Sequence, residues 1–136
     1  MENYICIGKL DSSKLGAYKN LIITEDLILT YERLNNHIYK YHKNEYNEIK
    51  SYIIDIIRHP DYVIEDNKHT DTLIFLQHIS KINKKARIVV KLATNKNDKM
   101  YNKNSIITLM RQRDKSWEQT LKNRGKIIYK KLDKSE

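Results

Sequence analysis

The chain has 136 residues, the usual length of one domain, so we expect a single domain spanning residues 1–136. It is 40% hydrophobic and 32% charged, a composition that disfavours an intrinsically disordered chain. Twenty-six Lys and Arg against seventeen Asp and Glu give a net charge of +9, which favours a polyanionic partner: RNA, DNA or an anionic membrane surface. The codon usage of an AT-rich genome is an alternative source of this charge.

The cysteine content and the N-terminus bear on the compartment. Cys6 is the only cysteine, which excludes an intramolecular disulfide framework and a multi-cysteine zinc site and fits a reducing compartment. The N-terminus, MENYICIGKL, lacks an apolar run of signal-peptide length, and no stretch approaches the ~18 apolar residues of a membrane span. We therefore expect a cytoplasmic protein that does not interact with membranes.

The N-terminal third begins with short apolar runs. Residues 4–10 alternate weakly and predict a strand, and residues 21–24 and 27–30 predict a hairpin around Glu25 and Asp26. Thr30 is a suitable N-cap for a helix whose apolar stripe recurs at three- and four-residue spacing. A second helix is expected over residues 46–57, ending before Pro60 because the residue before a proline avoids the helical region.

The second half of the chain is rich in β-branched residues. The runs that predict strands are 61–65, 72–79, 87–93 and 105–110, and a brief helix over 117–121 and a last strand over 126–129 follow. Consecutive strands with short connections indicate an antiparallel meander. The expected fold is α+β, with an N-terminal strand or hairpin and two helices packed on an antiparallel sheet of four or more strands.

The sequence has no phosphate loop, dinucleotide fingerprint, HExxH or GxSxG motif, so the histidines are the first candidates for catalysis. On a helical wheel, His37 and His42 fall on opposite edges of the apolar stripe, each roughly 70° from its centre at about 100° per residue. A histidine at such a boundary is partly buried yet reaches solvent, which suits proton transfer near neutral pH. The alternative is that both are ordinary boundary residues.

The remaining histidines are weaker candidates. His59 precedes the proline and is expected to complement the helix dipole at a C-terminus. His69 is expected to be exposed in a polar turn, and His78 ends a predicted strand.

RNA can be cleaved by its own 2′-hydroxyl when a base, an acid and groups that stabilise the phosphorane oxygens are present, without a metal in principle. Lys91 lies inside an apolar strand that would hold its ammonium group beside a phosphate, or would turn it to solvent. Ser105 and Thr108 are three residues apart, hence on opposite faces of a strand unless a bulge intervenes.

A metal is not expected, because His37 and His42 are five residues apart rather than the four that converge two imidazoles on one ion. Some tyrosines near basic residues could stack on unpaired bases, although core packing is the usual role of this residue: Tyr31, Tyr39, Tyr41 and Tyr101. The densest basic run could follow a phosphate backbone or form a solvated face: Arg111, Arg113, Lys115, Lys122, Arg124, Lys126, Lys130 and Lys131.

In order and spacing, the segments IGKLD, ERLNNHIYKYH, HPDYVIED, DTLIF, IVVKLAT, NSIIT and KIIYKKL resemble phage and mobile-element members of the barnase/EndoU/colicin/RelE-like nuclease superfamily. The resemblance implies N-terminal helices on a four-stranded antiparallel sheet and metal-independent RNA cleavage that leaves a 2′,3′-cyclic phosphate. It implies a site made by His37, His42 and Arg33, with Lys91 and either Ser105 or Thr108. The position before the second histidine, usually Arg, is Tyr41 here, and Lys40 or Lys43 would replace that contact.

The sequence thus predicts an endoribonuclease of the toxin or phage type, with one of His37 and His42 as general base and the other as acid or phosphate contact. Lys91 would stabilise the oxyanion, and Ser105 or Thr108 would bind the phosphate. The expected substrate contacts are Arg33, Lys40, Arg111 and Arg113. The expected partners are RNA, possibly tRNA, and a cognate inhibitor, with no cofactor. The alternatives are a non-catalytic RNA- or DNA-binding module and an interaction protein of a phage or mobile element.

Overall fold

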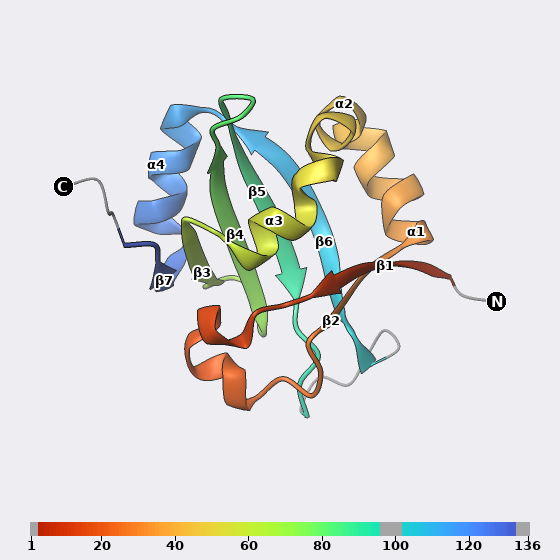
Figure 1. Ribbon diagram of the computed structural model, residues 1–136, viewed down its shortest axis with the longest axis vertical. Helices are drawn as coiled ribbons and strands as arrows, with labels where there is room; N and C mark the ends of the chain where they lie inside the picture. Colours follow the sequence, from red (N-terminus) through yellow and green to blue (C-terminus); the bar gives the residue numbers. More distant parts are fainter. Residues whose placement is uncertain (1–2, 96–101, 133–136) are drawn as a thin grey trace.

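The computed structural model describes residues 3–95 and 102–132 and has an α+β fold built on one seven-stranded sheet (Figure 1). The order of the strands across the sheet is β1-β2-β6-β5-β4-β3-β7. Their bounds are β1 Tyr4–Lys9, β2 Asp26–Thr30, β3 Tyr62–Asp66, β4 Thr72–Ile79, β5 Lys84–Lys91, β6 Asn104–Gln112 and β7 Gly125–Lys130.

The predicted antiparallel meander is confirmed as β3, β4, β5 and β6, and β7 adds to it antiparallel to β3. The sheet as a whole is mixed, because β2 pairs with β6 in parallel, through Leu27 with Asn104 and Ile28 with Ser105. A parallel pair needs a long crossover, and the helices and the meander that lie between β2 and β6 in the chain supply it.

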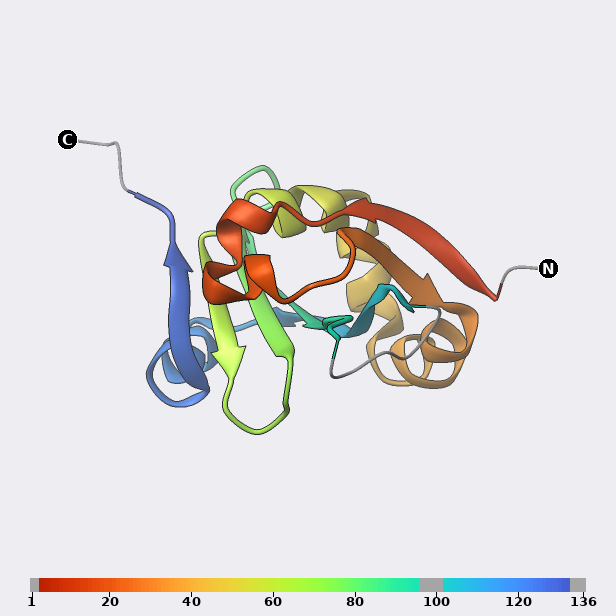
Figure 2. The same cartoon turned by 90° about the horizontal axis from the view of Figure 1, so that it is seen from below.

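The predicted hairpin between residues 21–24 and 27–30 is wrong. The antiparallel partner of β2 is β1, and Ile22 makes only an isolated bridge with Thr94. Two short 3₁₀ helices occupy the connection, η1 Ser12–Lys14 and η2 Gly16–Asn20, and Figure 2 shows this segment beside β3. The hydroxyl of Tyr18 donates to Oε2 of Glu65 at 2.6 Å, which fixes η2 against that strand.

The helical region is one nearly continuous series of segments. They are α1 Tyr31–Arg33, the π-helix η3 Leu34–Ile38, α2 Tyr39–Ile49, the 3₁₀ helix η4 Lys50–Tyr52 and α3 Ile53–Arg58. Thr30 is the N-cap, as predicted, and its hydroxyl accepts from the backbone N–H of Arg33 at 3.1 Å. The series ends at His59, a C-cap with non-helical φ and ψ before Pro60, also as predicted.

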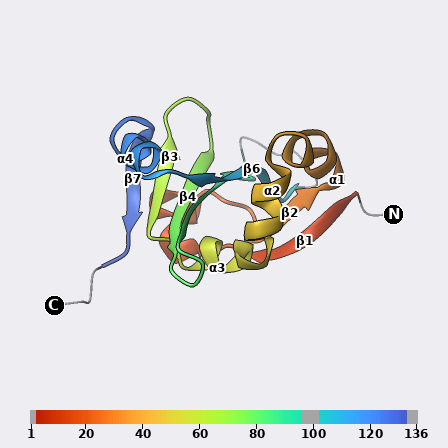
Figure 3. The same ribbon diagram turned by 90° about the horizontal axis from the view of Figure 1, so that it is seen from above.

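The two faces of the sheet are covered differently. On one face, buried residues of α3 pack with Val63, Phe75 and Ile88 in the main core. On the other face, Ile64, Ile74, Leu76 and Val89 form a smaller cluster with Trp117 of α4, which runs from Asp114 to Asn123. Figure 3 shows α4 and β7 at one end of the sheet and α1 and α2 at the other. No helix in the described ranges is long and apolar enough to cross a membrane.

Candidate functional site

The helix containing the two candidate histidines lies against β6, beyond the point where β2 stops pairing with that strand. Nε2 of His37 is 3.1 Å from Oγ1 of Thr108, and the two atoms share a hydrogen bond. The sequence predicted both residues as site residues, and the fold joins them across 71 positions of the chain. A ring nitrogen and a hydroxyl on one point of a sheet face are groups that can contact the same phosphate.

The second histidine lies beside the first. The ring centroids of His37 and His42 are 5.7 Å apart, and the ring of Tyr41 is 5.5 Å from that of His37. Nδ1 of His42 is hydrogen-bonded to Oε1 of Glu45 at 3.1 Å. A carboxylate on Nδ1 fixes the tautomer and orientation of an imidazole, so that Nε2 is directed toward a ligand.

The two histidines come together because the helix is irregular at this point. The helical wheel predicted that the side chains of His37 and His42 point in different directions, which holds for an ideal α-helix. Here the N–H of Tyr39 donates to the carbonyl of Leu34, the five-residue bond of a π-helix, and this pattern brings residues five apart toward one face. His42 itself has φ −140° and ψ 30°, which kinks the helix. π-Helical turns are frequent at functional sites.

The electrostatic environment of His37 favours the neutral ring. Partial burial, the charge of Arg33 and the neighbouring His42 together lower the pKa of His37 from its ordinary value. A neutral imidazole is the form that accepts a proton. The ring of His37 is therefore in its neutral, proton-accepting form over a wider range of pH than an exposed histidine.

The predicted hydroxyls lie on one face of the sheet because of a bulge in β6. Val90 pairs with Ile106 and Val89 with Thr108, so Ile107 is the extra residue. Ser105 and Thr108 would otherwise alternate, but the extra residue places both on the face that carries Val89. Only Thr108 contacts a histidine among the described hydrogen bonds, and Ser105 is buried where β6 meets β2.

Lys91 is not brought to the histidines. It pairs with Ser105, two positions along β5 from the residue that faces Thr108, and its ammonium group donates to the carbonyl of Thr70 in the β3–β4 turn. The oxyanion role predicted for Lys91 therefore has no support in this geometry.

The predicted substrate contacts surround the histidines unevenly. Arg33 is near enough to His37 to lower its pKa, and the ammonium of Lys40 lies over the ring of Tyr41, 5.4 Å from its centroid. Arg111 lies opposite α2, where its Nε is 3.4 Å from Oε1 of Glu48. Arg113 is exposed at the start of α4. Tyr31, Tyr39 and Tyr41 are exposed, and Tyr101 lies outside the described residues.

A basic pocket of about 650 Å³ adjoins Glu45 and Arg111. Its cationic residues are Lys84, Lys85, Arg111 and Arg113, and its acidic residues are Glu45 and Asp114. Two of these cations are paired, since the ammonium of Lys85 donates to Asp114 at 2.6 Å and Nε of Arg111 lies 3.4 Å from Oε1 of Glu48. The lining residues leave this pocket with a net positive charge beside Glu45.

The residue that sequence reasoning missed is Glu45. It binds His42 through one oxygen and accepts from the backbone N–H of Arg111, on the open edge of β6, through the other, at 2.6 Å. Its spacing of three residues from His42 was the available signal, because residues three apart are neighbours on a helix.

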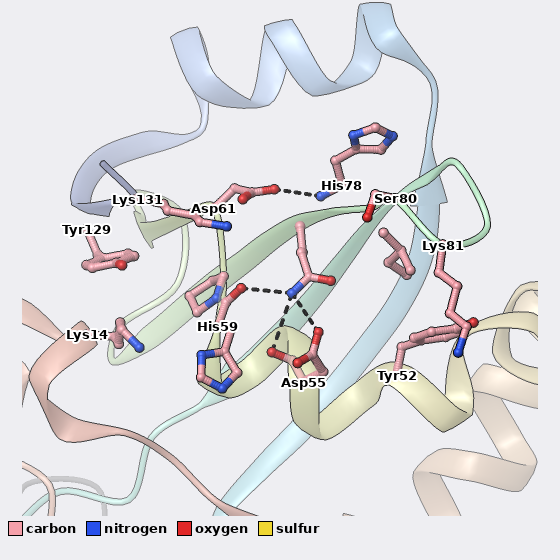
Figure 4. Close-up of a pocket in the computed structure, with 13 residues that line it drawn as sticks. Lys14, Tyr52, Asp55, His59, Asp61, His78, Ser80, Lys81, Tyr129 and Lys131 are labelled. Atoms are coloured by element: carbon pink, nitrogen blue, oxygen red, sulfur yellow. Dashed lines mark hydrogen bonds between the residues drawn. The ribbon is translucent and has the colours of Figure 1, made fainter. Parts of the chain in front are cut away.

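A second pocket, of about 550 Å³, contains His59 and His78 at the end of α3 (Figure 4). Its polar groups are used by the fold. Nε2 of Gln77 donates to Oδ2 of Asp55 at 3.1 Å and to the carbonyl of His59 at 2.8 Å, and Asp61 accepts from the backbone N–H of His78 at 2.7 Å. The ring of His78 is also hydrogen-bonded to the side chain of Asn83. Outside this pocket, the ring of His69 is largely exposed, as predicted, and is hydrogen-bonded to Asp66. None of these contacts joins a histidine to a hydroxyl or a second imidazole.

In the part of the chain that the structure describes, no group of three or more His, Cys, Asp or Glu residues is placed to hold a metal ion. Comparison with known proteins identifies no relative: no family model, no curated protein and no solved structure matches this chain.

Proposed function

We propose that the protein is a metal-independent endoribonuclease. The observation that carries this proposal is the contact of His37 with Thr108 on the sheet face, with His42 at a ring distance of 5.7 Å and Glu45 orienting it. Cleavage by the 2′-hydroxyl requires a base, an acid and groups that stabilise the phosphorane oxygens, and two imidazoles, a hydroxyl and nearby guanidinium groups can fill these roles.

In this mechanism His37 is the general base, because its lowered pKa keeps the ring neutral. It removes the proton of the ribose 2′-hydroxyl as that oxygen forms a bond to phosphorus. The bond from phosphorus to the 5′ oxygen breaks, and His42, held by Glu45, gives its proton to the leaving oxygen. The products are a 2′,3′-cyclic phosphate and a 5′-hydroxyl.

The phosphorane oxygens carry the charge that develops in this reaction. The hydroxyl of Thr108 would donate to one of them, and the guanidinium of Arg33, close to His37, would supply positive charge. The resemblance to the barnase/EndoU/colicin/RelE-like superfamily supports the same chemistry, with Glu45 and Arg111 as additions and Lys91 left out.

The direct test uses the purified protein, tRNA and a 5′-labelled single-stranded RNA in excess chelator. We expect cleavage products that end in a 2′,3′-cyclic phosphate, and no cleavage where a 2′-deoxy nucleotide replaces the nucleotide that supplies the attacking hydroxyl. Cleavage at that deoxy position, or loss of activity on chelation, would contradict the mechanism.

The second candidate function is a non-catalytic RNA-binding module, which the cationic pocket beside Arg111 favours. Such a module binds the same RNA and leaves it intact over long incubation. A nuclease of the toxin or phage type is further expected to slow the growth of its host on induction unless a cognate inhibitor is present. The double variant His37→Gln, His42→Gln is the matched control.

A further inference from the structure

A separate pocket of about 390 Å³ lies where α4 packs over β5 and β6. Cationic side chains line it from four parts of the chain: Lys68, Arg87, Arg111 and Arg124. No Asp or Glu is among its described lining residues. The nucleolytic mechanism above uses neither Arg87 nor Arg124.

Three buried polar atoms lack a hydrogen-bond partner among the described residues, and all three belong to this pocket: Nε of Arg87, Nε of Arg124 and Oε1 of Gln112. Buried polar groups are almost always hydrogen-bonded, because an unpaired one destabilises the folded protein. Two N–H donors and one acceptor gathered in one pocket are therefore expected to have partners in a ligand.

The acceptor is held in place by α4. Nε2 of Gln112 donates to Oγ1 of Thr120 at 3.2 Å, and the hydroxyl of Thr120 donates to the carbonyl of Ser116 at 2.8 Å. These bonds fix the amide of Gln112 so that Oε1 remains for a donor from outside the protein.

The positive charge of the pocket is only partly balanced. Asp66, whose side chain is 1% exposed, lies 3.7 Å from Nε of Arg124, and it also accepts from the N–H of Lys68 and from His69. Burial and the nearby Arg124 lower the pKa of Arg87, although an arginine stays protonated in proteins. One carboxylate thus faces two half-buried guanidinium groups, and an anion would complete the balance.

The pocket lies on the same face of the sheet as the histidine site. Arg87 pairs with Met110 across β5 and β6, and the next pair on that face is Val89 with Thr108. Two strand residues span about 7 Å, so the pocket is one step along the sheet from Thr108.

We propose that this pocket is a phosphate-binding subsite for the backbone of a single-stranded RNA whose cleaved bond lies at His37 and Thr108. Arg87 and Arg124 donate to one phosphate, and Gln112 accepts from a ribose hydroxyl of the adjoining nucleotide. The inference rests on the proposed function for the identity of the ligand, whereas the anion-binding chemistry stands on the pocket alone.

The test measures affinity for an unmodified RNA of about eight nucleotides, which keeps its ribose hydroxyls. The variants below are made in the full-length His37→Gln, His42→Gln protein, which leaves the RNA uncleaved and serves as the wild-type reference for binding. Arg87→Gln should weaken binding about tenfold or more and lower the salt slope by about 0.7, the value for one lost phosphate contact. Lys122→Gln is the matched control, because it removes the same charge from an exposed position of α4 outside the pocket. It should bind nearly as the wild type does.

Gln119→Glu is a second variant, at an exposed residue of the pocket wall, and it should weaken binding by a similar factor without removing a buried group. If Arg87→Gln does not fold, Gln119→Glu alone tests whether the pocket binds RNA. Wild-type affinity in both variants, an equal loss in Lys122→Gln, or no RNA binding by the wild type would overturn the subsite. If the wild type binds but never cleaves RNA, and the losses remain selective, the nuclease proposal fails and the subsite stands.

Discussion

The backbone N–H of Arg111 donates a 2.6 Å hydrogen bond to Oε2 of Glu45, which joins the open edge of β6 to helix α2. The other oxygen of Glu45 orients His42. One carboxylate therefore both covers a strand edge and positions a candidate catalytic ring, and these two roles can be separated by substitution.

Glu45→Gln should keep the acceptor for the N–H of Arg111 and lose the charged partner of His42. We expect a free energy of unfolding within about 1 kcal/mol of the wild type, with a lower kcat for RNA and a shifted pH profile. Glu45→Ala should lose stability as well, measured by urea unfolding. Equal kcat values and pH profiles in Glu45→Gln and the wild type would exclude a positioning role.

His37→Ala and His42→Ala should each lower the cleavage rate on the order of 10²-fold or more while the protein stays folded, as expected when one acid-base group is removed. His59→Ala and His69→Ala are the controls, because their rings lie outside the site. Rates near that of the wild type in both site variants would remove these histidines from the chemistry.

The pKa of His37 should lie below that of an exposed histidine, and Arg33→Gln should raise it, since Arg33 is one of the causes of its depression. Titration of the imidazole protons by NMR measures this shift. Lys50→Gln removes the same charge further along the helical region and serves as control. An unchanged titration of His37 in Arg33→Gln would contradict the proposed environment.

The lowered pKa of His37 also makes the free energy of unfolding depend on pH. The unfolded chain binds a proton at His37 with a pKa of about 6.5, above the value in the folded state. Stability is therefore full above about pH 6.5, falls as the pH drops below that value, and levels off below the folded-state pKa. His37→Gln should reduce this acid-side loss in urea unfolding measured across the range. An identical pH dependence in the variant would show that His37 does not contribute.

Asn104 should be important for stability, because its buried side chain accepts from the N–H of Ala93 and donates to the carbonyls of Thr24 and Asp26. Asn104→Ala should cost on the order of 3 kcal/mol, since it leaves buried backbone groups unpaired. Asn47→Ala, at an exposed position of α2, should change stability by less than about 0.5 kcal/mol. Chemical denaturation compares the two variants.

RNA affinity should fall steeply with salt if the cationic pockets bind phosphates. Each contact with a single strand contributes a slope of about 0.7 log unit per decade of salt concentration. A titration by fluorescence anisotropy measures this slope. An affinity that hardly changes with salt would favour codon usage, rather than RNA binding, as the source of the net charge of +9.

The regular parts of this fold could be predicted from local patterns. β-Branched runs predicted β3 to β6, and Thr30 and Pro60 marked the ends of the helical region. The hairpin prediction failed because Glu25 and Asp26 lack the glycine or asparagine that a two-residue turn favours, so β2 pairs instead with the distant β1.

The candidate site was predicted in its residues and not in its geometry. His37, His42 and Thr108 were identified by residue type, whereas their approach depends on a π-helical turn and on the bulge at Ile107. Neither the π-helical turn nor the bulge has a recognisable pattern in the local sequence. The pairing of Lys91 with the Thr70 carbonyl depends on how a turn folds back, which strand periodicity does not encode.

The contact between His37 and Thr108 spans 71 positions, and between them the chain must build three strands of the sheet before β6 can take its place. A growing polypeptide that ends before β6 carries both histidines without the hydroxyl and the strand edge that organise them. The candidate catalytic centre thus forms only after β6 has been synthesised, and a translation product that stops short of β6 is expected to be inert toward the RNA around it.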